Sequence, residues 1–247
     1  MTPPRTPPAP AGGASGTSGP FRRTTTADTT SSLGAVLLAF DTATPLVSVA
    51  LHDGERVVVE HSSEQPMKHG EHLAPLIARA MEEAGVVRQD LTAVAVGVGP
   101  GPFTGLRVGV VTARTLGFVL DVPVYGVCSL DAVALEVVGS RTTSGSFLVA
   151  TDARRKEVYL ASYDADGRRL EGPVVTRPAE VATDTPVAGA GPELYPDAFP
   201  HPIAPTRPSA GWLAAGVADE LVELLDPEPL YLRRPDAVAG APRKHVL

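Results

Sequence analysis

Short apolar runs bounded by turn residues open the ordered part of the chain. Val36–Asp41 is an apolar run that ends on an acid, and a second run covers Val47–Leu51. Asp53-Gly54 between this run and Arg56–Glu60 is typical of a tight hairpin turn. The pattern therefore predicts three antiparallel strands.

Helical periodicity follows and then alternates with strands. Gly70–Ala84 carries an apolar stripe that includes Leu73, Leu76 and Ile77, and Gly85 provides a helix end. Strands and helices then alternate, as in an α/β lobe. We expect a strand at 93–98, a helix at 104–120, a strand at 122–127 and a helix at 129–138.

The same pattern begins again after a Ser/Thr/Gly-rich linker at 139–146. Phe147–Asp152 is another apolar run that ends on Asp, Glu157–Tyr163 is a second run, and Asp166-Gly167 is another turn. This order predicts an internal duplication and two related lobes. The rest of the second lobe is poorer in helix, with short strands at 174–175 and 186–190 and a short helix at 192–198.

A last amphipathic helix is expected at 210–225, where Trp212, Leu213, Val217, Leu221 and Leu224 have helical spacing. The domain organisation that we predict is a disordered Pro/Gly/Ser/Thr-rich tail at 1–34, a first lobe at 35–140, a second and smaller lobe at 146–236, and a loose tail at 237–247. Residues 209–226 could pack back on the first lobe.

Composition narrows the class of protein. Of 247 residues, 43% are hydrophobic, which is enough for a core. No apolar run reaches the length needed to span a bilayer, and no secretory signal is evident. The single cysteine, Cys128, cannot form an internal disulfide and is best explained as a buried apolar filler. We therefore expect a cytoplasmic protein without membrane contact. A net charge of −7 argues against direct binding of a nucleic-acid backbone, so a role in an RNA pathway would be indirect, through a partner.

The run from Val96 to Gly109 joins a buried strand to a helix through a loop with Gly99, Pro100, Gly101 and Pro102. Thr104 is expected to cap the helix, and the N–H groups of the loop could hold an anion. No Gly-Lys-Ser/Thr follows and the glycine spacing does not fit a dinucleotide fingerprint, so close packing is favoured over phosphate binding.

Two strand-ending carboxylates, Asp41 and Asp152, suggest a cleft of the kind that sugar kinases and actin-like ATPases use for Mg-nucleotide. The candidates for nucleotide contact lie either near the ends of these strands or in and just after the central loop. They are Asp41, Thr42, Thr44, Gly101, Thr104 and Asp152. The alternative is that each Asp caps a turn. Arg154, Arg155 and Lys156 crowd Asp152 and could pair with it.

His69 and His72 lie near the start of the first helix with Glu71 between them, but a third metal ligand is not evident. We predict no metal site and no Gly-x-Ser-x-Gly hydrolase elbow.

Small residues recur every fourth position of the helix after the central loop, at Gly105, Gly109, Ala113 and Gly117. Another face of this helix carries Arg107, Val111, Arg114 and Phe118. A helix that is apolar nearly all round is covered on both sides. Either a partner chain covers one side, which the small-residue ridge would let approach closely, or the helix is sandwiched within the protein.

Several of these runs together resemble one family. Phe40-Asp-Thr-Ala-Thr44, Ser48-Val-Ala-Leu51, His69 with Leu73 and Pro75, Gly99-Pro-Gly-Pro-Phe-Thr-Gly-Leu-Arg-Val-Gly109, Asp152-Ala-Arg154, Glu157-Val-Tyr159 and Pro229-Leu-Tyr-Leu-Arg233 are similar to the TsaB (YeaZ) family. Pro102 stands where the family usually has Ser, which weakens a phosphate contact by the loop.

The resemblance implies an α/β actin-like ATPase (ASKHA) fold and a part in adding threonylcarbamoyl to the adenosine beside the anticodon of tRNA. It implies a scaffold or activator subunit, not an enzyme by itself, that dimerises with a TsaD-like transferase, with a TsaE-like ATPase joining them. A homodimer is possible, and ATP/ADP and Mg could bind within the complex. His69 and His72 are closer in sequence than the metal-binding histidines of TsaD, in agreement with a non-catalytic homologue.

Family members pair through their first-lobe helices. The corresponding interface residues here are His69, Leu73, Gly105, Arg107, Gly109, Val111, Arg114 and Phe118. The alternatives are an ASKHA-type ATPase or phosphotransferase that uses Asp41 and Asp152, and a peptidase.

Overall fold

The computed structural model describes residues 35–63 and 68–233. The predicted tails at 1–34 and 237–247 lie outside these residues. The first half of the described chain contains β1 (Val36–Asp41), β2 (Ser48–His52), β3 (Val57–Ser62), α1 (His69–Ala84), η1 (Arg88–Asp90), β4 (Leu91–Gly99), α2 (Phe103–Leu120), β5 (Val124–Cys128) and α3 (Ser129–Gly139). The second half contains β6 (Phe147–Asp152), β7 (Val158–Tyr163), β8 (Arg169–Thr176), η2 (Pro178–Glu180), β9 (Val187–Ala188), α4 (Gly191–Leu194) and α5 (Ala210–Ala218).

The strands of the described residues form two mixed sheets with orders β3-β2-β1-β4-β5 and β8-β7-β6-β9. In both sheets the first strand pairs antiparallel with the second, and the second with the third. A later strand then adds parallel on the other side of the first strand, β4 beside β1 and β9 beside β6. The prediction of two related lobes, each opening with an antiparallel three-stranded unit, is confirmed.

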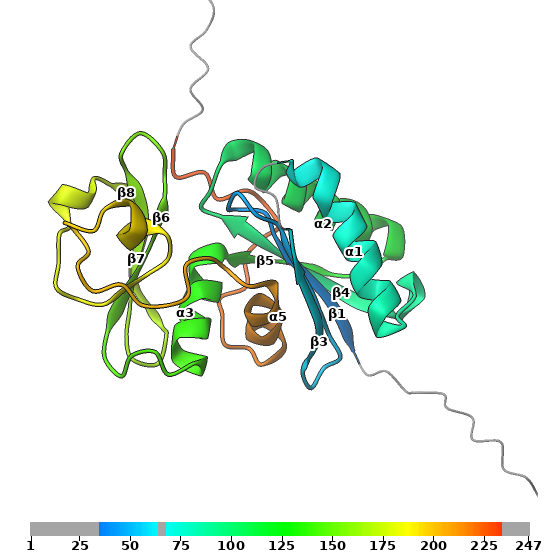
Figure 1. Ribbon diagram of the computed structural model, residues 1–247. Helices are drawn as coiled ribbons and strands as arrows, with labels where there is room; N and C mark the ends of the chain where they lie inside the picture. The colour runs from blue at the N-terminus through cyan, green and yellow to red at the C-terminus, as the bar shows by residue number, and fades with distance from the viewer. Residues whose placement is uncertain (1–34, 64–67, 234–247) are drawn as a thin grey trace, which may run out of the picture. The chain divides into compact units, whose positions relative to one another are not determined.

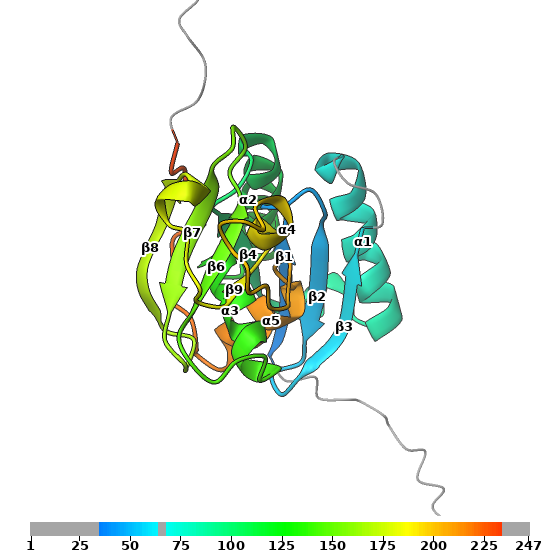
Figure 2. The ribbon, with the colours of Figure 1, turned by 60° about the vertical axis from the view of Figure 1, so that its left-hand side comes forward.

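Alternation along β1 explains how the first sheet is covered on both faces. Leu38 and Phe40 belong to the core shared with α1 and α2, whereas Leu37 and Ala39 pack with Leu213 of α5. Because successive side chains of a strand point to opposite faces, one apolar strand serves two layers. Figures 1 and 2 show α1 and α2 on one side of the sheet and α5 on the other.

The last helix is shorter than its apolar pattern predicts. α5 ends at Ala218, with the N–H of Asp219 donating to the carbonyl of Ala215. The helix is closed here, because Glu220 has φ +55° and the N–H of Leu221 donates back to the carbonyl of Gly216. Leu221 and Leu224 therefore do not extend the helix, and Leu225 exchanges backbone hydrogen bonds with Gly126 at the edge strand β5.

α2 corrects a further expectation. It is the one helix among the described residues that is long and apolar enough to cross a membrane by length and composition, although the sequence pattern indicated none. Its inner face, which includes Leu106, Val110 and Ala113, is buried and the helix packs on β4. A core helix of a globular domain passes the same criterion, so α2 carries no conclusion about membranes.

Candidate functional site

The loop between β4 and α2 is packed tightly against the end of β1. Gly99 has φ +102°, and a Cβ on Gly101 would lie 2.3 Å from the carbonyl oxygen of Ala43. Only glycine permits such an approach, so the close packing favoured by the sequence is confirmed. Thr104 is not the cap of α2: Pro102 occupies that position without a side-chain cap, and Thr104 lies within the first turn.

Asp41 ends β1 but points into the protein. Its Oδ1 accepts a hydrogen bond from the N–H of Ala43 (2.7 Å), and its Oδ2 accepts one from Oγ of Ser129 (2.5 Å). The same Ser129 oxygen accepts from the N–H of Gly99 at 3.2 Å. Burial raises the pKa of the Asp41 carboxyl, although both hydrogen bonds act in the opposite direction. Asp41 thus connects β1, the central loop and the start of α3.

A pocket lies where β1 and β6 end, and we call it the strand-end pocket. It has a volume of about 480 Å³ and is lined by Ala43, Thr44, Pro45, Leu46, Pro102, Thr151, Asp152, Arg154, Ala190, Glu193, Thr206 and Arg207. Of the six residues predicted to contact nucleotide, Thr44 and Asp152 line it. Asp41 and Thr42 are buried, and Oγ1 of Thr42 donates to the carbonyl of Gly105 at 2.8 Å.

Asp152 has the cationic partner that its neighbours predicted. Arg154 makes an ion pair with it at 3.5 Å, and the N–H of Arg154 donates to Oδ1 at 2.7 Å. The pocket lining is otherwise mixed in charge, since it also contains Glu193 and Arg207. Two acids and two arginines give this pocket no excess of positive charge to attract a polyphosphate.

The small-residue ridge of α2 faces the interior of its own chain, not a partner. A Cβ on Gly105 would lie 2.4 Å from the carbonyl oxygen of Thr42, and one on Gly109 would lie 2.3 Å from Oγ1 of Thr42. At Gly117 the added atom would meet Val124. The ridge lets α2 approach Thr42, directly after β1, and Val124 of β5 closely, which corrects its interpretation as a contact for another chain.

Two residues of α1 named as interface candidates are also buried. His69 places Nε2 2.6 Å from the carbonyl oxygen of Thr44, and Leu73 belongs to the main core cluster. Neither side chain faces outward, so their expected role at an interface can only be indirect. No group of three metal-ligating side chains occurs among residues 35–63 and 68–233.

The outer face of α2 is exposed and apolar. Val111 is 61% exposed and Phe118 is 89% exposed, and Arg107 and Arg114 flank them. These four residues line a groove of about 780 Å³ whose other wall is formed by Glu228, Pro229 and Tyr231 of the C-terminal segment. Isolated exposed apolar side chains are common, but Val111 and Phe118 both line one groove, which makes this face a candidate interaction surface.

Sequence reasoning missed the C-terminal wall and Phe103, which is stacked on Tyr231 with ring centroids 5.2 Å apart. A signal was present, since Pro229-Leu-Tyr-Leu-Arg233 is one of the runs that resemble the TsaB family. Periodicity could not show that this segment crosses to α2.

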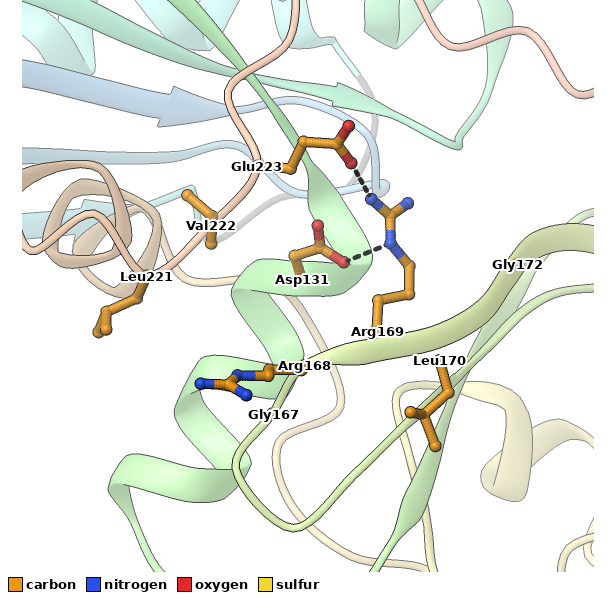
Figure 3. A pocket seen from close by; sticks show the side chains of 9 residues that line it. All are labelled: Asp131, Gly167, Arg168, Arg169, Leu170, Gly172, Leu221, Val222 and Glu223. Atoms are coloured by element: carbon orange, nitrogen blue, oxygen red, sulfur yellow. Dashed lines mark hydrogen bonds and ion pairs between the residues drawn. The ribbon is translucent and has the colours of Figure 1, made fainter.

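A second polar cluster joins elements distant in sequence. Arg169 of β8 pairs with Asp131 of α3 (3.5 Å) and with Glu223 after α5 (2.7 Å), as Figure 3 shows. The hydroxyl of Tyr163 donates to Asp131 at 2.8 Å. Burial raises the pKa of Asp131, while Arg169 acts to lower it. The adjacent Cys128 is fully buried, and burial raises the pKa of its thiol to about 12, which confirms the apolar-filler interpretation.

Comparisons with known proteins agree with this architecture. Residues 60–226 match the family model described as TsaD, tRNA N6-adenosine threonylcarbamoyltransferase. The crystal structure of YeaZ from Pseudomonas aeruginosa matches with a TM-score of 0.69 and 31% identity, over 80% of this chain and 100% of that one. The fold is therefore that of the actin-like ATPases, in a two-lobed form with a short second lobe.

Sequence relatives define the family more closely. An uncharacterized protein of Mycobacterium tuberculosis is 45% identical over 213 residues, covering 82% of this chain and 94% of the relative. The tRNA threonylcarbamoyladenosine biosynthesis protein TsaB of Escherichia coli (strain K12) is 37% identical over 131 residues, covering 53% of this chain and 55% of that protein. The chain belongs to the TsaB (YeaZ) family.

Proposed function

We propose that this chain is a cytoplasmic, non-catalytic scaffold and activator subunit of the complex that adds threonylcarbamoyl to tRNA adenosine. It pairs with a TsaD-like transferase, and a TsaE-like ATPase acts with them. Membership of the TsaB family supports the pathway. The observation that carries the docking role is the exposed strip of Val111 and Phe118 beside the groove on α2.

The alternative, an ATPase that uses Asp41 and Asp152, has less support from the geometry. Asp41 is enclosed and already accepts two hydrogen bonds, and Asp152 is paired with Arg154. A carboxylate that holds Mg-nucleotide needs free oxygens at an open site. Asp152 lines the strand-end pocket, but its carboxylate is paired with Arg154, and the pocket has no surplus of cations.

The first lobe at 35–140 supplies the docking face, and the second lobe at 146–236 supports it through the C-terminal wall of the groove. The same face can pair with a second copy of the chain when the transferase is scarce. Both arrangements bury Val111 and Phe118, which would otherwise remain in contact with water.

The proposal is tested by replacing one exposed apolar side chain at the docking face. Val111→Ser should weaken binding to the TsaD-like transferase by about tenfold, since a desolvated apolar side chain at an interface core contributes on the order of 1–2 kcal/mol. Binding is measured by isothermal titration calorimetry, and threonylcarbamoyl transfer to tRNA is assayed with the reconstituted complex.

Val174→Ser is the matched control, because Val174 is also an exposed valine but lies on β8. It should bind as the unchanged protein does. Equal affinities for the two variants would overturn docking through α2. If a complex that contains Asp152→Asn assembles normally but no longer transfers threonylcarbamoyl to tRNA, the result would favour the ATPase alternative.

A further inference from the structure

Arg107 is held in one orientation on the outer face of α2 before any partner binds. Its guanidinium carbon lies 3.7 Å from the centroid of the Phe103 ring, and its Nε donates a hydrogen bond to the hydroxyl of Tyr231 at 2.9 Å. Phe103 is itself stacked on Tyr231 with an interplanar angle of 25°. One aromatic face and one hydroxyl thus fix an exposed arginine.

The guanidinium nonetheless keeps most of its donors. An arginine has five N–H groups, of which the Nε group is used here, so four remain on the two Nη atoms. Among the described residues no acceptor or carboxylate pairs with those atoms. Arg114, Arg169 and Arg233 differ, because each makes an ion pair with an acid of its own chain.

Such an arrangement has an energetic consequence for binding. Immobilising a long side chain at an interface costs conformational entropy, and a side chain fixed beforehand avoids most of that cost. A fixed planar fork fits a carboxylate, because two parallel N–H···O bonds can form together. Arg107 lies four residues before Val111 on the same helix face, about 6 Å away along the axis.

We propose that Arg107 is a specificity-determining residue that receives an Asp or Glu carboxylate from a helix of the TsaD-like partner. That helix places apolar side chains over Val111 and Phe118, and its acid lies at the end nearest the central loop. This inference rests on the proposed function and adds the chemistry of the partner surface. A carboxylate is favoured over an RNA phosphate because apolar side chains line much of the groove and the charge of its second arginine, Arg114, is balanced by Glu228.

The test compares Arg107→Lys, which keeps the charge but loses the planar fork, with Tyr231→Phe, which removes only the hydroxyl that orients it. Affinity for the TsaD-like transferase should fall about tenfold for Arg107→Lys and about threefold for Tyr231→Phe, measured by titration calorimetry. Arg177→Lys, an exposed arginine beyond β8, is the control and should leave affinity unchanged.

A charge exchange identifies the partner group. Arg107→Glu should abolish measurable binding, and replacing one acid on the transferase's docking helix by Arg should restore it. If no single acid restores binding, or if Arg107→Lys binds the transferase normally, the inference is wrong. Loss of tRNA affinity in Arg107→Lys with unchanged transferase affinity would instead assign the residue to RNA phosphate.

The outcome also separates this inference from the proposed function. Normal binding of the Arg107 variants together with weak binding of Val111→Ser would overturn the carboxylate receptor and leave docking through α2 intact. Normal binding of all of them would overturn both. Circular dichroism and the thermal midpoint of each variant show whether it is folded.

Discussion

The carboxylate of Asp41 is buried where β1 ends, and both of its oxygens accept hydrogen bonds from neighbouring segments. A strand-ending acid beside two threonines is a reasonable nucleotide ligand, yet its carboxylate lies against Gly97 and accepts from Ser129 and Ala43. These hydrogen bonds to the Asp41 carboxylate fix the positions of the end of β1, the central loop and the start of α3 relative to one another. The central loop depends on this network, since Ser129 also accepts from Gly99.

The pH dependence of stability tests this role of Asp41. Because burial raises its folded pKa above the ordinary value of 3.8, the protonated form favours the folded state. The contribution of this carboxyl group to the free energy of unfolding is therefore fully present below pH 3.8, and it is lost as the pH rises through the folded pKa. Relative to the unchanged protein, Asp41→Asn should gain stability over that interval, as measured by urea unfolding at a series of pH values.

A second variant at this position separates structure from binding. Asp41→Ala leaves Ser129 and Ala43 without an acceptor and should cost about 1–3 kcal/mol of unfolding free energy. At temperatures where this variant remains folded, its affinity for the transferase should be unchanged. Loss of tRNA modification by a complex that still assembles would contradict the structural role.

At the scale of elements, α2 has two faces with different tasks. Its inner glycines let the helix lie close to Thr42, directly after β1, and to Val124 of β5, and its outer residues form one wall of the groove. A helix that is apolar on both faces is consistent with coverage by its own sheet on one side and by another chain on the other. The fixed loop from Gly99 to Pro102 sets the direction in which the helix leaves the sheet.

Substitution of an inner glycine should therefore affect stability before it affects docking. Gly109→Ala places a Cβ against Thr42 and should destabilise the protein by about 1–3 kcal/mol through overpacking. Gly70→Ala in α1 is the control, because a Cβ there meets nothing within 4 Å, and it should be neutral or slightly stabilising. Urea unfolding measures both, and a neutral Gly109→Ala would mean that α2 is not so closely packed.

At the scale of the whole molecule, charged and backbone contacts connect the second sheet to the first part of the chain. Arg169 links β8 to α3 and to the segment after α5, and Arg233 pairs with Glu157 and donates to the carbonyl of Ala153. The N–H of Leu230 donates to Val98 at the end of β4. The C-terminal segment thus connects the groove on α2 with the turn between β6 and β7, which lies beside the strand-end pocket.

Removing the central cation of this linkage should destabilise the whole protein. Arg169→Gln leaves Asp131 largely buried without its cation and should cost about 1.5–3 kcal/mol of unfolding free energy. Arg168→Gln, at the exposed neighbouring position in Figure 3, should change stability by less than about 0.5 kcal/mol. Similar unfolding midpoints for the two variants would show that the cluster contributes little.

The sequence alone determined the strands, most of the helices, the duplication and the family. Period-2 and period-3.6 patterns, Asp-Gly turns and the run from Gly99 to Gly109 are local features, and local chemistry decides them. Tertiary structure decided that Asp41 points inward, that the ridge of α2 faces its own sheet, that α5 ends at Ala218 and that Tyr231 fixes Arg107. Periodicity shows which residues share a face, but only the packing of distant segments shows what covers that face.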